Sequence, residues 1–151
     1  MQTRLLTTLV LSAAAIAHAA DDRPAVRYRP SLLVQLAVGD LDRSIRFYTE
    51  TLGFELTERR DDLRFAHISC GVQGLQLGLS AGGEKPPDPG TVVLNFGVQG
   101  DIEAARGALE KRGVVFDGPT RVIPGKVRLA GFRDPDGYRI RLAGEDQGGT
   151  P

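Results

Sequence analysis

The sequence predicts an α+β fold built from two tandem βαβββ units. A strand, helix and strand pattern lies between Val34 and Leu56, and a similar pattern begins near Thr91. Corresponding positions lie about 60 residues apart, which is the mark of an internal duplication. The turn sequence Asp-Pro-Asp-Gly at 134–137 joins the last two strand patterns. We therefore predict two similar sheets, each with one helix.

Residues 1–19 are predicted to be a signal peptide that is removed. Arg4 precedes an uncharged run of apolar and small residues at 5–16, and Ala-His-Ala at 17–19 matches a small-x-small cleavage site. The run is short for a membrane span and charged residues follow it at once, so a retained membrane anchor is the less favoured alternative. We expect a periplasmic or secreted protein without membrane contact after cleavage, beginning with a lead-in at 20–30.

Composition and the cysteine count exclude several classes of protein. The chain has 19 Lys and Arg residues and 19 Asp and Glu residues, interspersed, so it lacks the basic footprint of a nucleic-acid-binding protein. Cys70 is the one cysteine, which excludes an intramolecular disulfide. We interpret it as a small buried residue rather than a nucleophile, because no second histidine of the mature chain is available to activate it.

The first unit is predicted at residues 31–80. Apolar residues alternate from Val34 to Val38, as in a half-buried strand. Asp40 then occupies an N-cap position and Gly53 a C′ position. Between them, apolar residues recur at helical spacing: Leu41, Ile45, Tyr48 and Leu52. Further strands are predicted at 54–56, 63–68 and 75–80, with a turn at 72–74.

The second unit is predicted at residues 91–143, after a linker at 81–90 that is rich in Gly and Pro. Residues 144–151 are expected to form a mobile tail. The predicted elements are a strand at 91–98, a helix at 101–111 that ends at Gly113, a short strand at 114–116, a loop at 119–125, and strands at 126–132 and 138–143.

Two motifs carry a resemblance to a known family. The pattern V-x-D-L-x-R-S-x-x-F-Y-x-x-x-L-G-F at 38–54, together with FRDPDGYRIRLAG at 132–144, resembles the vicinal oxygen chelate superfamily of glyoxalases, bleomycin-resistance proteins and extradiol dioxygenases. The resemblance implies that each unit, or module, curls a mixed sheet around a cup and carries its helix on the outer face. Bleomycin-resistance relatives generally form homodimers with clefts between chains. In this chain the two modules could instead complete one cup internally or swap modules with a second chain, and the linker is long enough for either.

The family geometry sorts the strand residues into two faces. The helix side is expected to hold Val34, Leu36, Val38, Leu75, Leu77, Leu94, Phe96, Ile140 and Leu142. The cup side is expected to hold Leu33, Gln35, Gln76, Val93, Asn95, Arg139 and Arg141. Strand alternation and family geometry agree on this register.

The resemblance also locates the metal ligands that enzymes of the family supply as His, Gln or Glu. These positions are occupied here by Leu33, Gln76, Val93 and Arg141. Two aliphatic groups offer no lone pair and a guanidinium opposes a cation, so we expect no metal and no other cofactor. The mature chain also has a single histidine, too few for a site with two or three histidines. Asp134 and Asp136 are better explained as turn residues than as oxygen ligands.

Amides and guanidinium groups on the cup side predict a ligand-binding site instead. Its candidate residues are Gln35, Gln76, Asn95, Arg139 and Arg141. Arginine binds carboxylates and phosphates, and amides fix carbonyl or hydroxyl groups, so the predicted partner is a small anionic or oxygen-rich molecule. The alternative is that both arginines pair with nearby carboxylates or lie at a solvated strand end.

Catalysis is the competing hypothesis. His67, with Leu63 and Phe65 on the same face, is interpreted first as a hydrogen-bonded packing residue. It is nevertheless the best candidate for acid-base chemistry, because its ordinary pKa lies nearest neutral pH. The enzyme hypothesis is a lyase or isomerase of glyoxalase type, or a dioxygenase-like enzyme, either metal-free or with unusual ligands. A third hypothesis is an interaction module with a degenerate cup.

Overall fold

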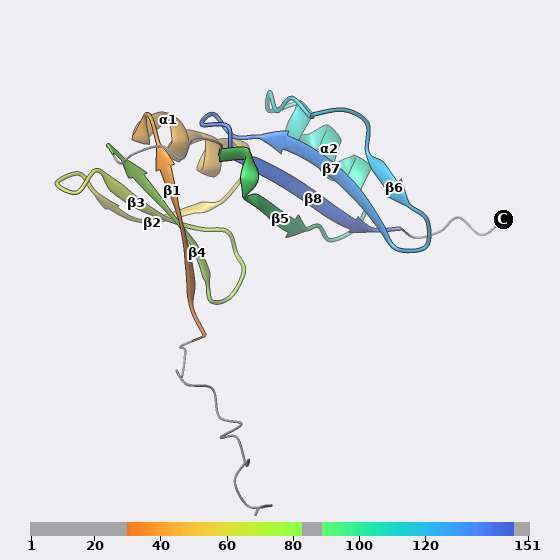
Figure 1. Ribbon diagram of the computed structural model, residues 1–151, viewed down its shortest axis with the longest axis horizontal. Coiled ribbons are helices and arrows are strands. Elements are labelled where there is room, and N and C mark those ends of the chain that lie inside the picture. Colours follow the sequence, from red (N-terminus) through yellow and green to blue (C-terminus); the bar gives the residue numbers. More distant parts are fainter. Residues whose placement is uncertain (1–29, 83–88, 147–151) are drawn as a thin grey trace, which may run out of the picture.

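The computed structural model describes residues 30–82 and 89–146, which form two modules side by side (Figure 1). The signal peptide, the lead-in up to residue 29, and residues 83–88 and 147–151 of the predicted linker and tail lie outside the described residues. Gly144 and Glu145, predicted as the start of a mobile tail, instead belong to the last strand. The first module contains β1 (Leu32–Val38), α1 (Leu41–Arg46), a π-helical turn η1 (Phe47–Thr51), β2 (Glu55–Arg60), β3 (Phe65–Ser69) and β4 (Leu75–Ala81). The second contains a 3-10 turn η2 (Pro89–Thr91), β5 (Val93–Gly97), α2 (Ile102–Glu110), β6 (Arg121–Ile123), β7 (Val127–Arg133) and β8 (Arg139–Glu145).

Each module has one four-stranded sheet with the same topology. The strand order is β1-β4-β3-β2 in the first sheet and β5-β8-β7-β6 in the second. In both sheets the first strand pairs in parallel with the last, and the remaining pairs are antiparallel. The predicted α+β class and the βαβββ repeat are confirmed.

The ends of the first helical segment follow from two residues. The side chain of Asp40 accepts a hydrogen bond from the backbone N–H of Arg43, which satisfies a donor that a helix start leaves without an intrahelical partner. The segment continues from α1 through η1 to Leu52, and Gly53 then adopts a φ of 77°, a conformation that glycine reaches without steric cost. Both predicted boundaries are confirmed, although the last turn is π-helical rather than α-helical.

Three element predictions are corrected. The strand predicted at 114–116 is absent from the described fold, where Phe116 forms only an isolated bridge with Phe132. The fourth strand of the second sheet is instead β6, inside the predicted loop at 119–125, and it pairs with β7. Val115 is 83% exposed, so this segment has no sheet neighbour that would bury it. In the first module, β3 starts at Phe65 instead of Leu63, because turns occupy residues 61–64.

The hydrophobic core lies between the helices and the sheets and is continuous across both modules. The residues predicted for the helix side are buried or partly buried, led by Leu36, Leu77 and Ile140, each at most 2% exposed. The rings of Phe54 and Phe96 pack edge to face across the modules, 5.3 Å apart. Within residues 30–82 and 89–146, no helix is long and apolar enough to cross a membrane.

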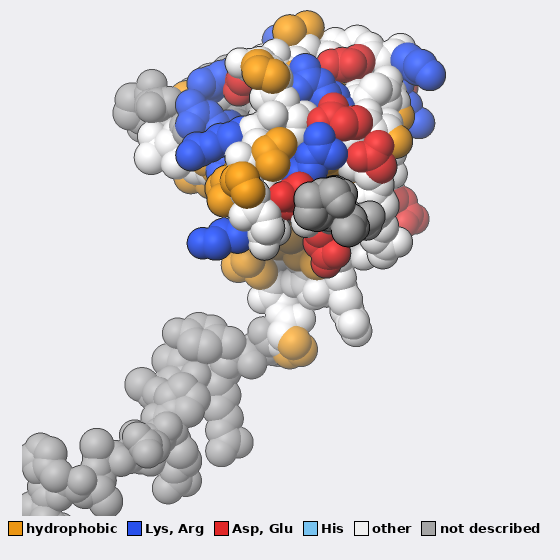
Figure 2. All heavy atoms as spheres, turned by 90° about the vertical axis from the view of Figure 1, so that its right-hand side faces the viewer, with side chains coloured by type: hydrophobic (Ala, Val, Ile, Leu, Met, Phe, Trp, Pro, Cys, Tyr) orange, Lys and Arg blue, Asp and Glu red, His pale blue; other side chains and the backbone are white. Residues whose placement is uncertain are grey.

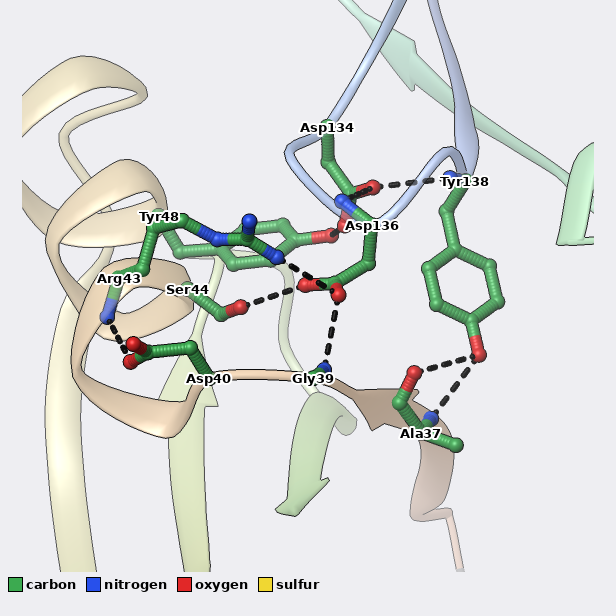
Figure 3. Close-up of polar contacts among 9 residues, drawn as sticks. All are labelled: Ala37, Gly39, Asp40, Arg43, Ser44, Tyr48, Asp134, Asp136 and Tyr138. Atoms are coloured by element: carbon green, nitrogen blue, oxygen red, sulfur yellow. Dashed lines mark hydrogen bonds and ion pairs between the residues drawn. The ribbon is translucent and has the colours of Figure 1, made fainter. Parts of the chain in front are cut away.

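A buried polar network joins the modules at the turn between β7 and β8 (Figure 3). The Asp136 carboxylate, whose side chain is 0% exposed, accepts hydrogen bonds at Oδ1 from the Gly39 N–H (2.8 Å) and the Arg43 guanidinium (2.9 Å). Its Oδ2 accepts a hydrogen bond from the Ser44 hydroxyl at 2.7 Å. The turn of the second module therefore binds the start of the first module's helix.

Two tyrosines extend this network. The Tyr48 hydroxyl donates to Asp134 Oδ2 at 2.7 Å, while Asp134 Oδ1 accepts from the N–H groups of Asp136 and Tyr138 at 2.9 and 2.8 Å. The Tyr138 hydroxyl accepts from the N–H of Ala37 at 2.9 Å and donates to its carbonyl at 3.1 Å. Burial raises the pKa of Asp134, although the Tyr48 bond opposes the shift, and burial also raises the pKa of Tyr48 well above its usual range. The turn interpretation of both aspartates is confirmed.

Candidate functional site

Three arginines line one hollow on the cup side of the second sheet. This arginine pocket has a volume of about 300 Å³. It is lined by Asp117, Gly118, Pro119, Arg121, Leu129, Gly131, Arg139 and Arg141. Three arginines and a single carboxylate therefore line one hollow, on the face of the sheet that α2 does not cover.

Strand register explains why these side chains share one face. In β8, Arg139 and Arg141 alternate with the buried residues Ile140 and Leu142. Arg141 pairs across the ladder with Gly131 in β7, and Arg121 in β6 pairs with Leu129 in β7. Paired residues point to the same side of a sheet, so β6, β7 and β8 each present one side of the pocket.

Gly131 leaves room at the centre of this pocket. A Cβ atom built on Gly131 would lie 3.6 Å from Asp117 Oδ2, so any side chain there would fill space between the arginines and the carboxylate. Asp117 itself is fixed by a backbone hydrogen bond from its N–H to the Gly131 carbonyl at 2.7 Å. The Gly131 backbone and the Asp117 carboxylate therefore form one part of the pocket wall, beside Leu129 and Pro119.

Asp117 supplies the one carboxylate among the residues that line the pocket, so positive charges exceed negative charges there. Among residues 30–82 and 89–146, no carboxylate forms an ion pair with Arg121, Arg139 or Arg141, whereas five other arginines do form such pairs. In Figure 2, which views the molecule from the second-module side of Figure 1, basic and acidic side chains are otherwise interspersed. An anion could therefore bind here without displacing an existing carboxylate partner.

The other predicted binding residues are more dispersed. Gln76 borders a separate hollow near the turn at 72–74. Asn95 lines a larger cavity between the modules and donates to the Val93 carbonyl at 3.4 Å. Gln35 is exposed on β1. The structure therefore brings Arg139 and Arg141 together in one pocket, and does not bring the three amides into that pocket.

The positions at which the resemblance predicts the family's metal ligands are adjacent in pairs in the two sheets. In the first sheet, Leu33 is paired with Gln76. In the second sheet, Val93 is paired with Arg139, which lies two residues before Arg141 in the same strand. Of these four predicted positions, only the amide of Gln76 offers an oxygen ligand. Within the described ranges, no group of three or more His, Cys, Asp or Glu residues could hold a metal ion. The residues present do not fit the metal of the family.

His67 lies on the cup side of the first sheet. Its Nδ1 is 3.0 Å from Glu58 Oε2, and its ring packs edge to face on Phe65 at 4.7 Å. Both side chains of the His67–Glu58 pair reach solvent. A carboxylate partner orients the imidazole, which suits either packing or proton transfer.

Sequence reasoning missed Arg121 and Asp117. Both fall between Phe116 and Lys126, where the predicted strand and loop were misplaced. The pairing of Arg121 with Leu129 is the signal that places this arginine beside Arg141, and it becomes visible only once β6 is recognised as a strand.

A family comparison agrees with this architecture. The family model of the Glyoxalase/Bleomycin resistance protein/Dioxygenase superfamily matches residues 29–142. The chain belongs to this superfamily. The family resemblance predicted from the two sequence motifs is therefore confirmed.

Relatives within the superfamily include proteins named as lactoylglutathione lyases. The lactoylglutathione lyase of Escherichia coli O157:H7 is 30% identical over 128 residues, which cover 78% of this chain and 94% of that protein. A chloroplastic protein of Arabidopsis thaliana, named a probable lactoylglutathione lyase, is 35% identical over 133 residues, 82% of this chain. The chain spans only 37% of that plant protein's length.

Solved structures of the superfamily share the fold. TnmS3, an antibiotic binding protein from Streptomyces sp. CB03234, is 28% identical with a TM-score of 0.65, covering 82% of this chain and 99% of that one. A superfamily member from Sphaerobacter thermophilus is also 28% identical with a TM-score of 0.65, covering 80% and 98%. The predicted architecture of two curled mixed sheets is confirmed.

Proposed function

We propose that this superfamily member is a metal-independent binding protein that holds a small anionic molecule in the arginine pocket. The observation that carries the proposal is that Arg121, Arg139 and Arg141 line one hollow. Asp117 is the one carboxylate in its lining, and none of the three arginines forms an ion pair with a carboxylate in the described ranges. Guanidinium groups recognise carboxylates and phosphates through paired hydrogen bonds. Loss of the metal ligands at Leu33, Val93 and Arg141 removes the Lewis acid and leaves recognition as the main chemistry.

The relative TnmS3 supports a binding role, because its name describes a protein that binds a small molecule. The proposal also includes export, since residues 1–19 have the pattern of a signal peptide. N-terminal sequencing of protein recovered from the cell envelope fraction tests export separately, with cleavage after Ala19 as the expected result.

The first experiment measures metal and anion binding by the same preparation. We expect less than about a tenth of an equivalent of Mn²⁺, Fe²⁺, Ni²⁺ or Zn²⁺ after loading and desalting, because one amide cannot hold a divalent metal against exchange. Inorganic phosphate, succinate and S-lactoylglutathione are then titrated as anionic probes, with the rise in Tm as the readout. Stoichiometric metal retention would contradict the proposal.

Substitutions locate the binding. Arg141→Gln and Arg121→Gln should each weaken the binding of a responsive probe by roughly tenfold or more, because each removes a charge-assisted hydrogen bond worth about 1.5–3 kcal/mol. Arg133→Gln is the matched control, since Arg133 lies in the same sheet but donates to the Gly137 carbonyl instead of lining the pocket. If all three substitutions weakened binding equally, the anion would be attracted by the general positive charge of the sheet. That result would refute binding in the arginine pocket.

A metal-free lyase of glyoxalase type is the second candidate. It is favoured by the names of the relatives and by the His67–Glu58 pair, which could move a proton on the cup side of the first sheet. Turnover beyond one equivalent of product, abolished by His67→Gln, would support this candidate. A protein that saturates at one equivalent and releases its ligand unchanged supports the binding role.

A further inference from the structure

A second and larger hollow lies between the modules, on the opposite side of the second sheet from the arginine pocket. This inter-module cavity has a volume of about 590 Å³. Ile140 and Leu142 of β8 line it, whereas Arg139 and Arg141 of the same strand line the arginine pocket. At β8 the sheet therefore separates the two sites, whereas at the edge strand β5 the cavity also reaches Asn95, one of the residues predicted for the cup side.

The walls of the inter-module cavity are predominantly apolar and come from both modules. The first module contributes Leu52, Phe54 and Val72, while helix α2 contributes Ala108 and Leu109. Val72 is 51% exposed, so part of this apolar surface is in contact with water. Ligand sites typically have volumes of about 300–1,000 Å³ and apolar walls, and they often lie at interfaces between structural units. An apolar body would therefore bind here by removing that surface from water.

One cationic group stands at the wall of this cavity. The Arg112 guanidinium donates to the backbone carbonyls of Thr51 (2.9 Å) and Glu50 (3.4 Å), which hold it in place across the modules. Within residues 30–82 and 89–146 it forms no ion pair with a carboxylate, so its charge is held by neutral groups alone. An apolar wall with one fixed cation complements an amphiphilic anion better than a neutral amphiphile, and it does not complement a cationic molecule.

We propose that the inter-module cavity binds an organic monoanion with a hydrocarbon or aromatic body, such as a medium-chain carboxylate. The carboxylate head lies at Arg112, and the body packs on Phe54, Leu109 and their neighbours. This site is independent of the arginine pocket, where three arginines are proposed to recognise the ligand by its charge.

Cys70 provides a built-in reporter of occupancy. It is the one cysteine of the chain, it lines the inter-module cavity, and its side chain is partly exposed. A molecule in the cavity should shield its thiol from a bulky reagent. The rate of labelling by Ellman's reagent should fall in proportion to the fraction of unoccupied protein.

The test uses two probes with the full mature chain. The first is 1-anilinonaphthalene-8-sulfonate, whose fluorescence should rise to saturation at one equivalent. The second is decanoate, which should displace the dye and slow the labelling of Cys70, while decanol should do both more weakly. Unchanged Cys70 labelling at saturating decanoate would overturn the proposal.

Variants establish whether the probes bind in this cavity and whether Arg112 holds the charged head. Ala108→Phe fills the cavity from the exposed face of α2, so it should abolish binding of both probes without disturbing the core. Arg112→Gln should weaken the binding of decanoate by roughly tenfold and leave the binding of decanol unchanged, because only the charged carboxylate loses a hydrogen-bond partner. Lys111→Gln is the matched control, since it removes a neighbouring positive charge that does not line the cavity.

Two further outcomes are decisive. Arg141→Gln should leave decanoate binding unchanged, so the failure of the arginine pocket and the failure of this site are separable. Cys70 labelling could already be slow without any probe and become slower as the protein concentration rises. That behaviour would mean that a second copy of the chain covers the cavity. That result would overturn the proposal, as would dye binding that survives Ala108→Phe.

Discussion

Replacing Tyr48 by phenylalanine removes one hydroxyl from the buried network between the modules. That hydroxyl donates to Asp134 Oδ2 at 2.7 Å, and Tyr48 is 0% exposed, so water cannot replace it. A hydrogen bond to a charged group contributes about 1.5–3 kcal/mol, and the carboxylate oxygen would lose its tyrosine donor. We therefore expect Tyr48→Phe to lower the free energy of unfolding at pH 7 by about 1.5–3 kcal/mol.

The cost of this substitution should depend on pH. Burial raises the pKa of Asp134, so the folded chain holds a proton there at higher pH than the unfolded chain does. The contribution of Asp134 to stability is therefore fully present below its unfolded pKa of about 3.9 and is lost as the pH rises through the folded pKa. The Tyr48 bond lowers that folded pKa, so removing it raises the pKa further and increases the loss at neutral pH.

Urea denaturation at pH 4 and pH 7 measures both effects. The difference between the wild type and Tyr48→Phe should be larger at pH 7. Tyr138→Phe is the matched control, because its hydroxyl bonds the neutral backbone of Ala37, where a hydrogen bond contributes about 0.5–1.5 kcal/mol. A Tyr48→Phe cost below about 0.5 kcal/mol, or equal costs at the two pH values, would refute the assigned role of this bond.

Three further predictions concern single residues and are checked by urea denaturation. Gly74→Ala should lower the free energy of unfolding more than Gly71→Ala does. Both glycines have positive φ, but only a Cβ at Gly74 would clash, at 2.6 Å from the Pro30 carbonyl oxygen. Equal losses of stability would contradict a steric cause. Asp101→Ala should cost about 1 kcal/mol, because its carboxylate caps the N–H groups at the start of α2; retained stability and helicity would contradict capping. Phe132→Ala should cost about 3–5 kcal/mol, because the ring is 0% exposed, and a loss below about 1 kcal/mol would mean that the core closes around the gap.

The fold was predicted correctly where short sequence patterns determine the local structure. Asp40 and Gly53 bound the first helical segment because capping depends on a few neighbouring residues. The alternation along β8 placed Arg139 and Arg141 on one face and Ile140 on the other, as the ladder confirms.

Sequence could not supply features that depend on distant pairing. The strand β6 has three residues, too few for a period-two pattern, so Arg121 was hidden in a predicted loop. Asp136 was predicted as a turn residue, which is correct, but nothing near it in sequence indicates that its carboxylate binds Ser44. The same holds for the three cup-side amides, whose separation depends on the relative placement of the two sheets.

The network between the modules has a consequence for the order of folding during synthesis. Ser44 and Asp136 are 92 positions apart, and Tyr48 and Asp134 are 86 apart. A growing chain would therefore expose the whole first module before its buried hydroxyl groups meet their carboxylate partners. Contacts of such long range form late, because loop closure must come first. Although the halves repeat one another, we expect the first to reach its final stability only after the last hairpin of the second has been made.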